Sequence, residues 1–154
     1  MIYCDTSFLL ALYIQIEPGH VLALQTAATL HEPIALTLLV ELELVNGIRR
    51  CLSAHTINRE QHDAVFRQIR EDEAEGILVR CSLDQDEHYA RARELSKKFT
   101  PEVSARSLDI LHVAAASMLK TTHFATFDTK QRILAEKTGL KTIPKSIVTR
   151  QRKA

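Results

Sequence analysis

Carboxylates stand at positions of this sequence where they can do chemistry together. Asp5 ends the first apolar segment, Asp128 ends a later one, and Asp109 lies at the start of an apolar helical pattern. Glu41 and Glu43 lie in the first turns of another expected helix. Aspartate is rare in strands, and a buried carboxylate without a partner costs free energy. Asp5 in particular therefore needs a chemical explanation.

A divalent cation would explain acids that converge on one point. Two carboxylates about 5 Å apart repel by roughly 3 kcal/mol at an effective dielectric constant near 20. Either some of them take up protons, or a cation lies between them. Oxygen ligands without His or Cys favour Mg²⁺ or Mn²⁺. Such an ion polarises a phosphodiester and lowers the pKa of a bound water, so the expected chemistry is phosphodiester hydrolysis.

Helix capping is the competing explanation for these acids. A carboxylate in the first turn of a helix interacts favourably with the helix dipole and needs no further function. This alternative applies well to Asp109, with Ser107 as the expected cap, and to Asp128. It applies less well to Asp5, because Thr6 or Ser7 can cap the next helix without a buried charge.

Alternating strands and helices are expected to position the acids. Strands are predicted at 2–5, 34–37, 77–80, 123–127 and 140–143, and helices at 7–13, 20–31, 38–51, 57–73, 86–98, 108–119 and 128–137. Thr100-Pro101 is expected to break the helix predicted at 86–98. This alternation predicts an α/β fold, with about five mainly parallel strands and helices on both faces. In such sheets ligands bind beyond the carboxyl ends of the strands, where Asp5 is expected to point.

Length and composition favour one globular domain over residues 1–154. The chain has 154 residues, of which 45% are apolar and 25% charged, as in ordinary globular proteins. The net charge of +1 does not by itself indicate a nucleic-acid-binding protein. A basic C-terminal tail starts at about residue 145 and contains Lys145, Arg150, Arg152 and Lys153. This tail either binds phosphate or is a solvated terminus.

Several classes of protein are disfavoured by motifs that the sequence lacks. The three cysteines form no CxxC pair, and no HxxxH, GxSxG, GxGxxG or P-loop motif occurs. His112, three residues after Asp109, is expected to be a hydrogen-bonded structural residue. No signal peptide or apolar run of about 18 residues is present, so we expect a cytoplasmic protein without membrane contact.

Four segments carry a resemblance to a known family. IYCDTSFLLALY, ELELVNG, RSLDILHVAAA and FATFDTKQRILAEKTGLKTI together resemble the PIN-domain ribonucleases, in particular the VapC-type toxins of toxin–antitoxin pairs. The resemblance covers nearly the whole chain in the right order. It implies a PIN-like α/β/α sandwich and a homodimer that cleaves RNA with Mg²⁺ or Mn²⁺. It also implies a cognate antitoxin that inhibits the enzyme.

The same resemblance implies a site of four acids: Asp5, Glu43, Asp109 and Asp128. Glu43 is preferred over Glu41 because the segment 43–47 fits the family motif. The two glutamates lie about 200° apart around a helix, so only one can face the ion.

Roles within this site follow as hypotheses. Asp5 and Asp109 are expected to bind the metal directly, and the other two acids to complete the site and position the attacking water. Thr6 or Ser7 is expected to hold the Asp5 carboxylate. Arg106 is expected either to contact a phosphate or to form a salt bridge with a nearby acid.

The sequence therefore predicts a metal-dependent endoribonuclease that is the toxin of a toxin–antitoxin pair. One alternative is a non-catalytic PIN-fold module that binds proteins. Another is a PIN nuclease of RNA processing that has no antitoxin. A phosphoryl-receiver domain also gathers acids around Mg²⁺ at strand ends, but it expects an Asp after the third strand, where this chain has Val79-Arg80-Cys81.

Overall fold

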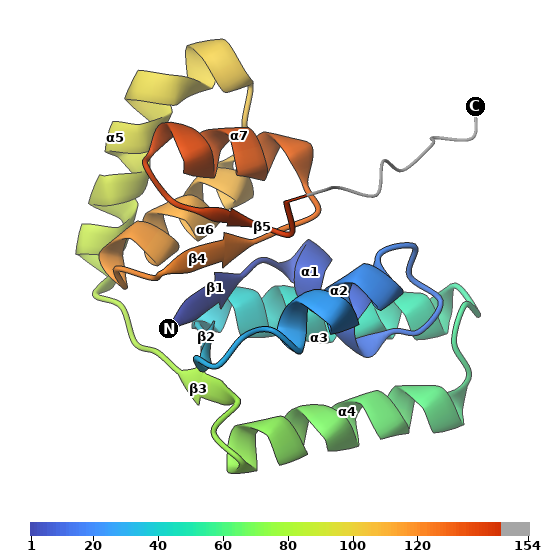
Figure 1. Cartoon of the computed structure of the whole chain (residues 1–154). Helices are drawn as coiled ribbons and strands as arrows, with labels where there is room; N and C mark the ends of the chain where they lie inside the picture. Colours follow the sequence, from blue (N-terminus) through green and yellow to red (C-terminus); the bar gives the residue numbers. More distant parts are fainter. Residues whose placement is uncertain (146–154) are drawn as a thin grey trace.

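Five short parallel strands form the sheet of the computed structural model, which describes residues 1–145 (Figure 1). The strands are β1 (Ile2–Cys4), β2 (Ile34–Leu36), β3 (Leu78–Arg80), β4 (His123–Ala125) and β5 (Thr142–Ile143). Their order across the sheet is β3-β2-β1-β4-β5, and every pair is parallel. β1 and β2 are buried along their whole length. They are therefore apolar at every position instead of alternating with polar residues.

Helices cover the sheet in two groups. The helices are α1 (Thr6–Tyr13), α2 (His20–Ala27), α3 (Leu38–Ser53), α4 (Arg59–Ala74), α5 (Gln85–Val103), α6 (Ser107–Met118) and α7 (Thr129–Lys137). Figure 1 shows α1–α4 on one side of the sheet and α5–α7 on the other. Right-handed crossovers require this separation, because the chain adds strands in one direction up to β3 and in the other direction afterwards. The predicted α/β/α architecture is confirmed.

The reversal of direction creates a switch point between β1 and β4. These two strands are neighbours in the sheet, although more than a hundred residues separate them in the chain. In open parallel sheets the crevice at the carboxyl side of such a point is the usual ligand site. Tyr3 and Phe124 stack side by side beneath it, with ring centroids 5.5 Å apart.

Close packing of α1 against α3 explains a glycine in the segment 43–47. A Cβ atom added at Gly47 would lie 2.8 Å from Cδ1 of Leu10, closer than real carbon contacts. The two helices therefore approach one another more closely than a larger residue would allow without movement of Leu10.

Some predicted boundaries were wrong. α5 continues through Pro101 to Val103 instead of ending at residue 98. Pro101 lacks the N–H of one helical hydrogen bond, yet the helix continues for two more residues, and Ser104 in the left-handed conformation ends it. α2 ends at Ala27, earlier than predicted. The predicted basic tail after Lys145 lies outside the described residues.

Along residues 1–145, no helix is both long and apolar enough to cross a membrane.

Candidate active site

Asp5 caps α1 and is enclosed by hydrogen-bond donors. Its side chain accepts the backbone N–H of Phe8 at 2.9 Å, the hydroxyl of Ser7 at 2.8 Å and the hydroxyl of Thr126 at 2.7 Å. Asp5, not Ser7, is thus the N-cap of α1. The residue is fully buried. Burial raises the pKa of the Asp5 carboxyl, while His112 and these hydrogen bonds act to lower it.

The two glutamates of α3 have different partners. Oε2 of Glu43 accepts hydrogen bonds from the hydroxyl of Thr6 and from Nε2 of His112, both at 2.6 Å. The hydrogen bond from His112 lowers the pKa of Glu43. Glu41 instead forms a two-point ion pair with Arg80, at 2.8 and 2.9 Å. Glu43 therefore contacts Thr6, which follows Asp5 in the chain, and His112, whose charge acts on Asp5, whereas Glu41 contacts neither.

Asp109 and Asp128 lie at the starts of α6 and α7. Oδ2 of Asp109 accepts the backbone N–H of Arg106 at 2.8 Å, and its Oδ1 accepts the side-chain amide of Gln131 at 3.2 Å. α6 begins at Ser107 with Arg106 as its N-cap, so the expected cap at Ser107 was wrong. Asp128 caps α7 by accepting the backbone N–H groups of Lys130 and Gln131.

Three polar residues that the sequence analysis did not select as site residues support the acids: Thr126, Gln131 and His112. Thr126 donates to Asp5 and accepts the backbone N–H of Asp128 at 2.8 Å, so it links the ends of β1 and β4. Gln131 is buried, and its Oε1 atom has no hydrogen-bond partner among the described residues. Thr126 and Gln131 flank Asp128 in the segment FATFDTKQ, which is the only sequence signal that could have pointed to them.

The supporting residues proposed from the sequence are placed as follows. Ser7 contacts Asp5, whereas Thr6 contacts Glu43. The side chain of Arg106 is exposed and forms no ion pair within residues 1–145, so of its two expected roles the salt bridge to a nearby acid is not seen there.

Carboxylate oxygens are suitable ligands for a hard divalent cation, but the structure does not arrange the four acids around one point. Within the described part of the chain, no three His, Cys, Asp or Glu side chains are grouped so that they could hold a metal ion. Two carboxylate oxygens, Oε1 of Glu43 and Oδ2 of Asp128, accept no hydrogen bond from the described residues. Asp5 accepts from three donors, and the hydroxyl of Ser7 lies within hydrogen-bond distance of both its oxygens. Oε1 of Glu43 and Oδ2 of Asp128 are therefore the oxygens that remain available to a ligand.

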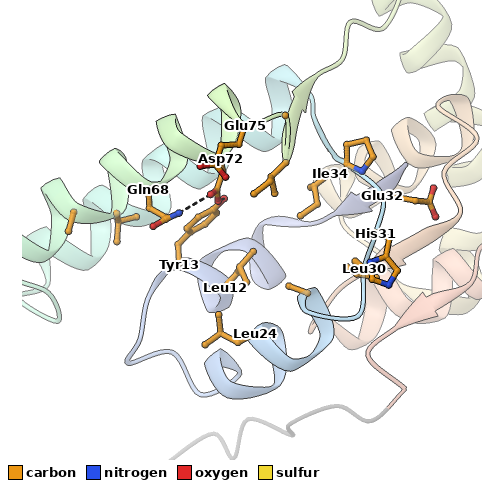
Figure 2. Close-up of a pocket in the computed structure, with 16 residues that line it drawn as sticks. Leu12, Tyr13, Leu24, Leu30, His31, Glu32, Ile34, Gln68, Asp72 and Glu75 are labelled. Carbon is orange, nitrogen blue, oxygen red and sulfur yellow. Dashed lines mark hydrogen bonds between the residues drawn. The ribbon is translucent and has the colours of Figure 1, made fainter.

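A separate groove lies between α1, α2 and α4 (Figure 2). Its volume is about 860 Å³. Asp72 within it accepts hydrogen bonds from the hydroxyl of Tyr13 at 2.5 Å and from the amide of Gln68 at 2.8 Å. Apolar side chains line most of the groove, together with the acids Glu32, Asp72 and Glu75, and its lining contains neither Lys nor Arg.

Comparison with protein families identifies the domain. The family model described as the PIN domain matches residues 2–137. The chain belongs to the PIN-domain family. Within this PIN domain, the segments that carry Asp5, Glu43, Asp109 and Asp128 all fall inside the matched range. No curated protein matches the chain.

Solved structures share the fold of this PIN domain. VapC20 of Mycobacterium tuberculosis, a toxin that cleaves the sarcin–ricin loop, has a TM-score of 0.65 and 19% identity, with 86% of this chain and 94% of that chain covered. FitAcB of Neisseria gonorrhoeae has a TM-score of 0.61 and 18% identity, with 94% and 97% covered. VapBC2 of Rickettsia felis, bound to a promoter DNA fragment, has a TM-score of 0.62 and 16% identity, with 93% and 98% covered.

Proposed function

We propose that this PIN domain is a metal-dependent endoribonuclease that hydrolyses RNA phosphodiester bonds with Mg²⁺ or Mn²⁺. The observation that supports the proposal best is Thr126, whose hydroxyl joins the carboxylate that follows β1 to the acidic loop that follows β4. The carboxylate of Asp5 and the backbone of Asp128 thereby meet at the switch point of a parallel sheet, where ligands bind. Oxygen-only donors at such a point favour a hard cation.

The ion would be held by Asp5, Glu43, Asp109 and Asp128. When bound, it polarises the phosphodiester and lowers the pKa of the attacking water. Ser7 and Thr126 orient Asp5 by donating to its oxygens.

The remaining site residues orient the water and the RNA. Oδ2 of Asp128 and Oε1 of Glu43 are the oxygens best placed to accept a hydrogen bond from the water, because protein donors leave them unused. Gln131 orients Asp109. The exposed guanidinium of Arg106, next to the start of α6, is suited to contact a phosphate.

Cleavage of defined RNAs tests this function. Purified protein is incubated with structured and single-stranded RNAs in Mg²⁺, Mn²⁺ or EDTA, and Asp109→Asn is assayed in parallel. We expect cleavage that requires the metal and falls to background in the variant. Folded wild-type protein, free of co-purified inhibitor, that cleaves no RNA with either ion would contradict the proposal and favour a non-catalytic binding module.

We further propose that the chain acts in the cytoplasm as the toxin of a toxin–antitoxin pair and that it forms a homodimer. The groove beside α4 supports a protein partner, because its mostly apolar lining, together with the acids Asp72 and Glu75, suits a basic amphipathic segment. Among the similar structures, VapC20 is a toxin. Light scattering at micromolar concentration tests the dimer.

A pair of matched substitutions tests the partner. Leu24 in the groove and Ile133 on α7 are both partly exposed, at 47% and 41%. We expect that the product of the adjacent gene inhibits wild type and Ile133→Lys but not Leu24→Lys. If no adjacent gene product inhibits the wild type, the RNA-processing alternative is favoured.

A further inference from the structure

A buried chain of hydrogen bonds leads from the sheet to one of the proposed metal ligands. The hydroxyl of Tyr3 in β1 lies 2.9 Å from Nδ1 of His112 in α6, and Nε2 of His112 lies 2.6 Å from Oε2 of Glu43 in α3. Tyr3 is fully buried and His112 is 1% exposed. Three elements that are distant in sequence thus meet at one imidazole ring.

The chemistry of the three groups fixes their donors and acceptors. A carboxylate only accepts, so Nε2 of His112 must carry the hydrogen that points at Glu43. Nδ1 can then accept a hydrogen bond from the Tyr3 hydroxyl. A tyrosine hydroxyl carries a hydrogen that it can donate, so Tyr3 can act as the donor to Nδ1.

Both donors to Glu43 act on the same oxygen. Thr6 and His112 each bind Oε2, and Oε1 accepts no hydrogen bond from the described residues. A carboxylate held by one oxygen presents the other in a fixed direction. Thr6 comes directly after Asp5, so Glu43 is also held in register with the first acid of the site.

We propose that His112 is a positioning residue that orients Glu43 for the divalent ion, and that Tyr3 fixes the ring of His112 in the required tautomer. The inference rests on the proposed function, since it gives His112 a purpose only if Glu43 faces an ion. His112 would then orient a metal ligand in addition to the structural role expected from its place on an apolar helix. Residues that orient a metal ligand typically change metal affinity or activity by about 10- to 100-fold when they are replaced.

Two amide substitutions separate positioning from burial. In His112→Gln the amide nitrogen takes the place of Nε2 and can still reach Glu43. In His112→Asn it takes the place of Nδ1 and can reach only Tyr3. We expect the Asn variant to bind Mn²⁺ about 10- to 100-fold more weakly than wild type, as measured by electron paramagnetic resonance. The Gln variant should lie within about threefold of wild type.

A second buried histidine provides the control. His88 is 8% exposed, and its Nε2 bonds to the backbone oxygen of Leu111. His88→Asn should lower the thermal unfolding temperature without weakening Mn²⁺ binding. Equal Mn²⁺ affinity of His112→Asn and wild type would overturn the inference, as would equal weakening in the two His112 variants.

Nuclear magnetic resonance tests the contact without metal or RNA. We expect a protected Hε2 signal of His112 in wild type, and a shift of that signal in Glu43→Gln. A ring protonated on Nδ1 and not on Nε2 would overturn the inference even where His112→Asn does not fold. Wild-type protein that binds no Mn²⁺ would overturn the proposed function itself, whereas binding that His112→Asn leaves unchanged would overturn only the role of His112.

Discussion

Thr126 donates a hydrogen bond of 2.7 Å to Asp5, although 121 residues separate the two in the chain. The same hydroxyl oxygen accepts the backbone N–H of Asp128. One side chain therefore serves a fully buried carboxylate and the cap of the next helix. Loss of this hydroxyl should affect the site and the fold together.

Thr126→Val removes the hydroxyl at nearly constant volume. It leaves Asp5 with one donor fewer and the backbone N–H of Asp128 without its acceptor. We expect the free energy of unfolding to fall by about 1–3 kcal/mol, the usual cost of an unsatisfied buried polar group. Urea titration measures this change. Thr29→Val, which alters an exposed hydroxyl, should stay within about 0.5 kcal/mol of wild type, and equal midpoints for the two variants would contradict the prediction.

The stability of Asp5→Asn relative to wild type should increase as the pH rises. Burial raises the pKa of Asp5 in the folded state above its unfolded value, so the folded protein binds the proton more tightly. The contribution of Asp5 to stability is then complete below the unfolded pKa, about 3.9, and is lost as the pH rises through the folded pKa. Asn has no such dependence.

Urea unfolding of both proteins at pH 4 and pH 7 checks this sign. The stability of Asp5→Asn relative to wild type should be greater at pH 7, and RNA cleavage by the variant should be absent. A difference in stability that does not change with pH would show that the pKa of Asp5 is not raised.

Glu43→Gln and Glu41→Gln make the same chemical change on one helix. Glu43 contacts Thr6 and His112 at the site, whereas Glu41 pairs with Arg80 at the surface. We expect kcat for RNA cleavage to fall by about 100-fold or more in Glu43→Gln, equivalent to about 2.7 kcal/mol of barrier. Glu41→Gln should change it by less than about threefold, the scale of a weakly coupled surface pair. The reverse order would exchange the two assignments.

Gln131→Met replaces the amide with an apolar group of similar volume, so Asp109 loses its side-chain donor. We expect the rate of RNA cleavage to fall by about 10-fold, because Asp109 is then less well oriented. Gln68→Met is the matched control, since Gln68 donates to Asp72 in the groove by the same type of bond. Single-turnover cleavage rates compare the two. Equal rates would mean that Gln131 does not act on the site.

Gly47→Ala should change the contact between α1 and α3 only slightly. The added methyl group would lie 2.8 Å from Cδ1 of Leu10, but this atom is the end of a flexible side chain that can move. We expect the free energy of unfolding to change by less than about 1 kcal/mol, because the gain in helix propensity offsets the cost of moving Leu10. Asn46→Ala, at the exposed neighbouring position, should not be destabilising. Chemical denaturation of the two variants provides the comparison.

The local pattern of apolar and polar residues predicted most of the fold, because segments typical of strands and of helices alternate clearly along the chain. The places of Asp5 and Asp128 could be predicted because both follow buried strands, and parallel strands present their carboxyl ends at one edge. The end of α5 could not be predicted, because a proline in the sequence indicates a helix break, whereas α5 continues for two residues beyond Pro101.

The partners of the acids were harder to predict than their positions. Thr126 and Gln131 have no unusual sequence signal, and their contacts with Asp5 and Asp109 depend on how distant elements pack. His112 was correctly expected to be hydrogen-bonded, but the sequence does not specify that Glu43 and Tyr3 are its partners.

Because Asp5 caps α1, this fold can persist after its chemistry is lost. Asn and Ser cap helices about as well as Asp, but neither supplies a carboxylate. A change from Asp to Asn needs a single base substitution in the codon. A duplicated gene could therefore acquire Asn at this position, lose hydrolysis in one step and still encode a folded scaffold. An Asn at this position in a related chain would thus be compatible with a folded scaffold that lacks the proposed hydrolysis.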